Sequence, residues 1–435
     1  MPLAEQNGGN LHSEKLGFLF TLFLIWTFVL LSRPQDIFTS LAPFRPAFLV
    51  SMIVLSFFMF SFIDSFLYPQ SSSQTSISST QTTLYTALIC IMIIGVPFAV
   101  YRKGAFLFVS DYIMKVALFY FIFIRMVDTV RKLERVLLVG CFGTGFYAYM
   151  AIMQGILKGQ RLTFGRMFDP NDLAFFSLSF LPFNFLFISK ENQLHHRIFA
   201  IFSVLSSILV ILMSGSRGGF IAFLAVVIFL FVKKSTSIKS WHKIILMVLG
   251  ITIIGSNLIL VDFSRYKTIT NLDSDYNFTS ETGRIRVWKE ALSFMIANPL
   301  TGVGVDCFPE ALGTKRSQDG SKPRWQTTHN SFLLIGAETG LIGFVLFVLM
   351  NFNSFRIFWH AEQKGISEKM LKIGEMAKIG FVGHLICIMF LSQTYSFYWI
   401  FYIALSCVLQ KFRRTEVESG LIDVSNNFRS SEARL

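Results

Sequence analysis

Hydrophobic residues run through this chain in long stretches that short polar segments separate. Gly17–Leu31, Ala47–Phe62, Ile198–Met213 and Ser331–Met350 approach or reach the length at which a helix crosses the hydrocarbon layer of a bilayer. Because lipid offers the backbone no hydrogen-bond partners, such a stretch is stable there only when its hydrogen bonds are internal, as in a helix. The pattern therefore predicts an all-α polytopic membrane protein.

About twelve transmembrane helices are predicted. They span residues 16–32, 47–68, 84–101, 113–127, 136–156, 173–188, 198–213, 220–232, 244–261, 331–350, 377–392 and 395–410. We divide the chain into transmembrane helices 1–9 (residues 1–261), a long polar loop with an amphipathic helix (262–330), transmembrane helices 10–12 (331–410) and a tail (411–435).

Composition agrees with this division. Only 15% of the 435 residues are charged, against about 25% in a soluble domain, and 53% are hydrophobic, including 50 Phe. The net charge of +13 raises the question of nucleic-acid binding. However, Lys and Arg are scattered through short segments between spans and do not line one polar face. We predict no nucleic-acid partner and attribute the charge to orientation in the membrane.

Short cationic loops are retained in the cytoplasm, which predicts the orientation. The segments Lys233–Lys243 and Arg356–Lys378 and the start of the tail are cationic, so both termini are expected inside and the 262–330 loop outside. The rule fits less well near the start. There the count places the uncharged Gln70–Thr83 inside and the cationic Arg102-Lys103 outside.

Arg217 is the first candidate for chemistry, because Ser214-Gly-Ser-Arg217-Gly-Gly219 lies between two apolar stretches with almost no room for a loop. An arginine at membrane depth usually snorkels, faces water or meets an anion. Its guanidinium is a planar fork of donors suited to phosphate. The alternative is an interfacial turn whose arginine reaches lipid headgroups.

The long loop contains the second candidate. Its nine Lys/Arg nearly balance its eight Asp/Glu, so the position of each charge matters more than the total. Residues 282–299 predict an amphipathic helix that Pro299 closes, with an apolar stripe formed by Ile285, Trp288, Leu292, Met295 and Ile296. Arg284 lies one turn before Trp288 at the edge of that stripe. Arg284 and Arg286 either face the same anion as Arg217 or are solvated helix charges.

His329 is the only histidine of this loop, and it lies in Thr327-Thr-His-Asn-Ser331 directly before a span. Its ordinary pKa of about 6.5 lets it accept a proton from a hydroxyl group at neutral pH. The alternative is that Thr328, His329 and Asn330 only cap the following helix. Glu338 lies on the opposite side of that helix from His329, so we predict that it supports neighbouring helices.

The segment before the sixth span adds further cations on the same side. Arg161 and Arg166 can contribute charge to an anion site, whereas Asp169 and Asn171 suit the start of a helix. His384, inside the eleventh span, is predicted to pack within the bundle.

Several other chemistries are not predicted. Leu300–Gly304 lacks the preceding strand and the Gly-Lys-Ser/Thr of a nucleotide-binding loop. Asp273 and Asp275 have a spacing that some metal-dependent sugar transferases use, but two acids in a polar loop are usually solvated, so we predict no metal and no cofactor. Four cysteines lie in apolar spans and Cys307 is alone in the loop, which argues against a disulfide.

Three motifs resemble, in their order and spacing, the O-antigen ligase and polymerase superfamily. The resemblance covers residues 165–350 of this chain. They are Ser214–Gly219, then Gly283-Arg284 with Trp288 and Asn298–Gly304, and then His329-Asn-Ser331 with Glu338-Thr-Gly340. Asp169–Asp172 and Arg33–Asp36 also resemble the branch of O-glycosylation ligases associated with exosortases.

The resemblance implies a GT-C-like fold of about twelve helices in the bacterial inner membrane, with its active site facing the periplasm. It implies transfer of a glycan from undecaprenyl pyrophosphate to a hydroxyl of lipid A core, another glycan or a protein, without a metal. Arg217 and Arg284 would hold the pyrophosphate, and His329 would activate the acceptor hydroxyl. The predicted catalytic residues are His329, Arg217 and Arg284, and the predicted substrate-binding residues are Arg217, Arg284, Arg286, Trp288, Arg166, Arg161 and Asn330.

Alternatives remain open within and outside the superfamily. A polymerase uses the same donor and differs only in the acceptor, which the sequence does not name. A lipid-glycan transporter also needs arginines between helices, although transporters usually show repeated halves with polar residues near mid-membrane. A structural scaffold would not need arginines and a histidine grouped at one surface.

Overall fold

The computed structural model describes residues 3–67, 79–158, 161–165, 169–232, 280, 283–360 and 366–432. Within them the first half contains the helices α1 (Leu3–Ser32), α2 (Pro34–Ile37), η1 (Thr39–Phe44), α3 (Pro46–Leu67), α4 (Thr80–Gly95), η2 (Val96–Phe98), α5 (Arg102–Tyr112), η3 (Ile113–Ala117), α6 (Leu118–Met126), α7 (Val130–Gln154), α8 (Pro170–Phe180), η4 (Pro182–Leu186), α9 (Leu194–Met213) and α10 (Arg217–Val232). The second half contains α14 (Arg284–Ala297), α15 (Phe308–Gln318), α16 (Ser331–Trp359), α17 (Glu368–Ile388) and α18 (Phe397–Glu432).

The prediction of a helical membrane protein is confirmed. Eleven of the twelve predicted spans fall on described helices, and the span at 244–261 lies outside the described residues, as does the cationic segment 233–243. Among the described residues, six helices are long and apolar enough to cross a membrane, and Pro46–Met59 and Arg217–Phe231 are shorter apolar helices. The count of twelve and the GT-C-like fold stay predictions.

Two local details differ from the sequence prediction. The fourth span begins at Arg102 rather than at residue 113, because a π-helical turn at Ile113–Ala117 joins α5 to α6 without a break. A small antiparallel hairpin, β1 (Ile156–Lys158) with β2 (Arg161–Thr163), follows α7. It was not predicted, since three-residue strands leave no clear period in a sequence.

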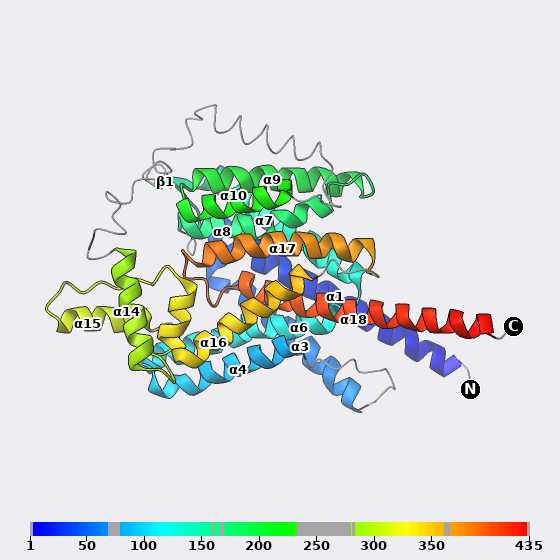
Figure 1. The fold of residues 1–435 in the computed structure, drawn as a ribbon, viewed down its shortest axis with the longest axis horizontal. Helices are drawn as coiled ribbons and strands as arrows, with labels where there is room; N and C mark the ends of the chain where they lie inside the picture. The colour runs from blue at the N-terminus through cyan, green and yellow to red at the C-terminus, as the bar shows by residue number, and fades with distance from the viewer. Residues whose placement is uncertain are drawn as a thin grey trace.

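The bundle has two distinct ends, which Figure 1 shows. Both chain termini lie at one end, here called the termini end, and α14, α15 and β1 lie at the opposite end, here called the loop end. Packing of α7 against α1 and α9, of α10 against α17 and of α16 against α4 joins the helices into one bundle. The described part of the predicted loop, residues 283–330, thus lies away from the termini, and the side of the membrane that each end faces stays a prediction.

Aromatic residues fill the centre of the bundle, whereas the outer helix faces are apolar and exposed. Trp26, Tyr85, Tyr120, Phe176 and Trp399 are fully buried. Exposed apolar side chains occur along many helices, as an outer surface in contact with lipid requires; examples are Leu49, Ile53, Phe57, Ile94, Phe106, Ile198, Leu224, Ile228 and Phe352.

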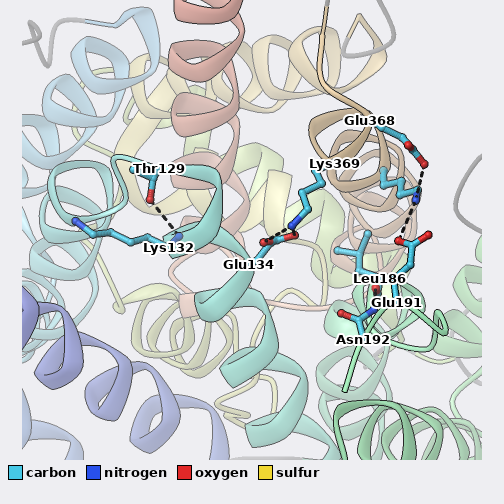
Figure 2. Close-up of polar contacts among 9 residues, drawn as sticks. Thr129, Lys132, Glu134, Leu186, Glu191, Asn192, Glu368 and Lys369 are labelled. Atoms are coloured by element: carbon cyan, nitrogen blue, oxygen red, sulfur yellow. Dashed lines mark hydrogen bonds and ion pairs between the residues drawn. The ribbon is translucent and has the colours of Figure 1, made fainter. Parts of the chain in front are cut away.

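Polar contacts connect the segments at the termini end (Figure 2). Lys369 at the start of α17 pairs with Glu134 of α7 at 3.1 Å, and Lys372 pairs with Glu368 at 2.7 Å. Asn192 donates to the carbonyl of Leu186 at 3.0 Å, which closes the turn before α9. These exposed ion pairs contribute little free energy individually. They mark where the apolar spans give way to water or headgroups.

A break in α16 explains the glycine-rich turn after Pro299. Gly340 has φ 73° and ψ −171° inside α16, so the helix is interrupted there. The carbonyl groups freed by the interruption accept from the turn, with Val303 N bonded to Ala337 O at 2.8 Å and Gly304 N bonded to Glu338 O at 3.1 Å. The turn therefore docks on α16 through its backbone.

Gly302 lies in this docked turn, and replacing it with Ala is expected to destabilise the protein strongly. Its φ of +63° is left-handed, and an added Cβ would collide with the backbone of Ala337 and Glu338. Gly320→Ala is the matched control, because Gly320 has φ +72° and open space around it. The control isolates the conformational cost, about 1 to 2 kcal/mol. Thermal unfolding in detergent should show a larger loss for Gly302→Ala, and equal losses would contradict the collision.

Candidate functional site

The turn between α9 and α10 at the loop end positions Arg217 as the first residue of α10. Ser214 Oγ donates to Ile211 O at 2.6 Å and accepts from Ser216 N at 3.1 Å, and Ser216 Oγ accepts from Gly219 N at 3.1 Å. Gly215 has φ +58°, which glycine adopts without strain. These local bonds fix the start of α10. The side chain of the half-buried Arg217 therefore extends from a rigid helix N-terminus.

The two glycines after Arg217 serve helix packing. A Cβ on Gly219 would lie 2.6 Å from Cβ of Ala174 on α8, and one on Gly218 would lie 3.1 Å from Cβ of Phe390. The groups that approach this backbone closely are therefore protein side chains. Small residues here bring α10 against α8 and against the segment after α17.

Arg161 of β2 connects two elements of the site. Its Nε donates to Ser214 O at 3.0 Å and its Nη2 donates to Asn171 Oδ1 at 2.8 Å. Arg161 thus holds the turn before Arg217 against the start of α8. Its predicted role in binding substrate stays a prediction, and Arg166 lies outside the described residues.

The start of α8 is capped as the sequence predicts. Asp169 Oδ1 accepts from Asn171 N at 2.7 Å and from Asp172 N at 2.9 Å. Pro170 occupies the first helical position, where its missing N–H costs nothing. Asp172 in turn accepts from Gln393 Nε2 at 2.7 Å, which joins α8 to the segment between α17 and α18.

The segment containing His329 is held by the same α17–α18 connection. Ser392 Oγ accepts from His329 N at 2.9 Å and from Thr327 Oγ1 at 2.6 Å. Ser331 Oγ donates to Leu391 O at 2.6 Å and accepts from Gln393 N at 2.8 Å. His329 itself has φ +51°. A residue with a side chain is uncommon in this conformation, so the surrounding bonds must hold it there.

Asn330 caps α16, which confirms part of the alternative reading of this motif. Its Oδ1 accepts from Phe332 N at 3.0 Å and from Leu333 N at 3.1 Å. The carbonyl oxygen is thus engaged with the helix, and substrate binding by Asn330 stays a prediction. The imidazole of His329 takes no part in the cap.

Helix α14 is confirmed, and the residues of its predicted apolar stripe are half-buried or exposed. The buried residues of α14 are Val287 and Ala291, which pack with Phe308 and Leu334. Leu292 is 43% exposed and Ile296 is 69% exposed. The sequence pattern indicated an apolar stripe, and only the position of α15 and α16 selects the face that packs.

Trp288 fixes α14 to the histidine segment. Its indole Nε1 donates to Thr328 O at 2.9 Å. Arg284, one turn earlier, is the half-buried first residue of α14, whereas Arg286 is exposed. The structure therefore gives Trp288 a positioning role between Arg284 and His329, and its contact with substrate stays a prediction.

His329 lies in an environment that favours its neutral form. Burial is the largest cause that lowers the pKa of His329 below its usual 6.5, and the positive charge of Arg284 lowers it further. Asp169 acts in the opposite direction. Arg284 and Asp169 thus lie near enough to the imidazole to act on it electrostatically. At neutral pH the ring is uncharged and able to accept a proton.

Sequence reasoning missed the residues that assemble this site from outside the three motifs. Ser392 and Gln393 bond to the histidine segment and to Asp172, respectively. Their signal was a short polar group, Ser392-Gln-Thr394, between two apolar stretches. Only Ser392 fell within a predicted span, and Gln393 and Thr394 lay in the two-residue gap between two spans, which the sequence analysis did not consider further.

The two remaining sequence predictions in this region are borne out. Glu338 is buried and accepts from Phe308 N at 3.2 Å and from Tyr395 OH at 2.8 Å, so it supports neighbouring elements. His384 is buried among Phe175, Phe381 and Tyr402. Asp273 and Asp275 lie outside the described residues, so the absence of a metal at them stays a prediction.

Taken together, the helices and the site define a multi-pass membrane protein with cationic residues and His329 at the loop end of its bundle. Residues 202–348 match the family model of O-antigen ligases. This match confirms the resemblance to the O-antigen ligase superfamily, and it includes Arg217, Arg284, Arg286, Trp288, His329 and Asn330. It supports a role in membrane glycan transfer.

A curated relative adds no functional detail. An uncharacterized protein of Haemophilus influenzae is 28% identical over 181 residues, which cover 38% of this chain and 43% of the relative. The chain therefore spans less than half of that protein's length. The activity, substrates and partners of the whole protein are proposals, and so is its closer relation to the exosortase-associated ligases.

Proposed function

We propose that this protein transfers a glycan from undecaprenyl pyrophosphate to an acceptor hydroxyl, as an O-antigen ligase does. The observation that carries the proposal is the neutral His329 beside the cationic Arg284, on elements that Ser392 and Trp288 hold in place. A proton acceptor next to a fixed positive charge is what glycosyl transfer from a pyrophosphate requires. The match over residues 202–348 supports the same reaction class.

The reaction balances with these residues alone. The acceptor oxygen attacks the anomeric carbon and its proton passes to the imidazole of His329. The bond from that carbon to the pyrophosphate oxygen breaks, and undecaprenyl pyrophosphate leaves with the electron pair. Arg217 and Arg284 stabilise the charge that develops on the leaving group, because guanidinium groups form short charge-assisted bonds to phosphate. His329 then releases the proton to solvent.

The position of the site leads to the proposed orientation. The three residues lie on elements at the loop end, opposite to the chain termini. Arg356 in the last turn of α16 and Lys369 at the start of α17 lie toward the termini end, and short cationic segments are retained in the cytoplasm. We therefore place the loop end in the periplasm of a bacterial inner membrane, with membrane lipids around the bundle.

Purified protein mixed with a lipid-pyrophosphate glycan and candidate acceptors tests the reaction. Bond formation with release of the lipid pyrophosphate supports a transferase. Movement of the glycan lipid across a vesicle membrane without bond change would instead support a transporter.

The acceptor distinguishes a ligase from a polymerase, which is the second candidate because the same donor chemistry serves both. A deletion strain of the source bacterium separates them. Unattached long chains indicate a ligase, whereas single repeat units indicate a polymerase. Acceptors to be tested are lipid A core, a glycan and a protein.

The pH dependence of transfer should follow the pKa of His329. Because this pKa is lowered, the neutral base persists below pH 6.5, and activity should fall only at more acidic pH. Asp169→Asn removes a negative charge that raises the pKa of His329. The acidic limb of the pH–activity profile should therefore move to lower pH in this variant. Arg284→Gln removes the positive charge that lowers the pKa of His329. The acidic limb of the pH–activity profile, measured on the activity that remains, should move to higher pH.

Asparagine is also a good helix cap, so Asp169→Asn should leave α8 intact. Histidine-labelled protein observed by nuclear magnetic resonance gives an independent reading of the pKa, with the His329 signal identified by its absence in His329→Asn. Shifts of the same sign in both variants would contradict the proposed electrostatic arrangement.

A further inference from the structure

A second cationic site lies at the termini end, far from the proposed active site. A pocket of about 260 Å³ opens between the end of α16, the segment before α17 and the middle of α18. Its lining includes the cationic or titratable Arg356, His360 and Arg413 and the apolar Ile357, Met370 and Leu409. The pocket lies at the opposite end of α16 from His329, which directly precedes that helix.

The polar side of the pocket carries positive charge. Arg356 lies in the last turn of α16 and its Nη2 donates to Asn353 Oδ1 at 3.3 Å. Arg413 of α18 donates through Nη1 to His360 O at 3.2 Å. These hydrogen bonds to neutral acceptors orient both guanidinium groups, and none of the described residues that line the pocket is acidic. Glu416, one turn after Arg413 on α18, accepts from Ser367 N at 2.9 Å and from Ser367 Oγ at 2.7 Å.

The opposite side of the pocket is apolar and continues onto a surface suited to acyl chains. Met370 and Leu409 line it and are buried. On the outer face of α16, Phe352 is 64% exposed and Trp359 is 49% exposed. Trp359 also lies 5.3 Å from the ammonium group of Lys378. A tryptophan at a helix end beside a lysine is typical of the headgroup level of a bilayer.

We propose that this pocket binds the phosphate group of an anionic membrane lipid. Two guanidinium groups and an imidazole face a space slightly smaller than the ~300 Å³ at which pockets for drug-sized ligands begin, so it suits a headgroup rather than a glycan. Basic pockets between transmembrane helices bind anionic lipid headgroups in this way. The adjoining apolar surface favours a lipid over a soluble phosphate as the source of that group.

The test uses the full-length protein in nanodiscs of phosphatidylcholine with increasing phosphatidylglycerol. Native mass spectrometry counts the anionic lipids that stay bound, and thermal unfolding measures the stabilisation that they provide. The variant Arg356→Gln/Arg413→Gln is compared with Lys132→Gln/Lys369→Gln, which removes the same charge at the same end but outside the pocket (Figure 2). In parallel, the protein in nanodiscs of phosphatidylcholine alone is titrated with inorganic phosphate. This titration tests whether a soluble phosphate is the ligand of the pocket.

The pocket variant should bind phosphatidylglycerol about 30-fold more weakly, as expected from the loss of two surface cations, and the control should change little. Protection by inorganic phosphate but not by phosphatidylglycerol would support the phosphate site and assign it to a soluble ligand. Equal lipid binding by both variants, with no protection by phosphate, would overturn the proposal. Unfolding in phosphatidylcholine alone shows whether both variants are folded, and Arg356→Lys/Arg413→Lys replaces the pocket variant if it is not.

Discussion

Replacing His329 with asparagine is expected to reduce glycan transfer by about 10²- to 10⁴-fold, the usual contribution of a general base. The neutral imidazole is the group that takes the proton from the acceptor hydroxyl in the proposed reaction. Asparagine has no group that accepts a proton at neutral pH. Transfer should be measured as kcat/KM with purified protein and a lipid-pyrophosphate glycan.

Asparagine is chosen because it separates catalysis from backbone conformation. His329 has φ +51°, and asparagine adopts this left-handed region as readily as any residue other than glycine. The bond from its backbone N–H to Ser392 Oγ should persist, so thermal stability should be preserved. His195→Gln, at the exposed start of α9, is the control and should keep full activity. Full activity in His329→Asn would show that the imidazole only occupies a position before α16.

Replacing Arg217 or Arg284 with alanine is expected to reduce kcat/KM by about 10²- to 10³-fold each, comparable to the loss of one fixed donor that stabilises charge in a transition state. Each guanidinium lies at the start of a helix, Arg217 on α10 and Arg284 on α14. The positive ends of both helix dipoles add to the attraction for a pyrophosphate. Expression and membrane insertion should be unchanged.

Lysine variants test the geometry of this anion site. Lysine keeps the charge but loses the planar fork of donors, so Arg217→Lys and Arg284→Lys should recover only part of the activity. Lys289→Ala is the matched control on α14, because Lys289 is exposed on the same helix and should not contact the donor. If Lys289→Ala lowers kcat/KM as much as Arg284→Ala does, the loss reflects any positive charge on α14. A specific site for pyrophosphate would then be contradicted.

The sequence predicted the site's helix boundaries more accurately than its contacts. Asp169 and Asn330 were expected to begin helices, and both do, because a cap depends on residues within a few positions of each other. The role of Gly302 and Gly340 was not predictable. Their conformations serve the docking of a turn on α16, which brings together residues nearly forty positions apart.

The face of α14 illustrates the same limit. Ile285, Trp288, Leu292, Met295 and Ile296 formed a reasonable stripe by spacing alone. Packing with α15 and α16 buries Val287 and Ala291, whereas Leu292 and Ile296 of the stripe stay exposed. Spacing predicts that a helix has an apolar side, but the partner decides which side is buried.

The sequence by itself determined the solvent, the helical class and the residue types available for chemistry. It did so because a lipid environment imposes long apolar helices, and because Arg217, Arg284 and His329 stand out against apolar neighbours. Only the tertiary structure decided that Arg284 and Asp169 act on His329, that Ser392 holds its backbone and that Arg161 joins Ser214 to Asn171. Those contacts depend on how separate helices pack, and no local pattern in the chain encodes them.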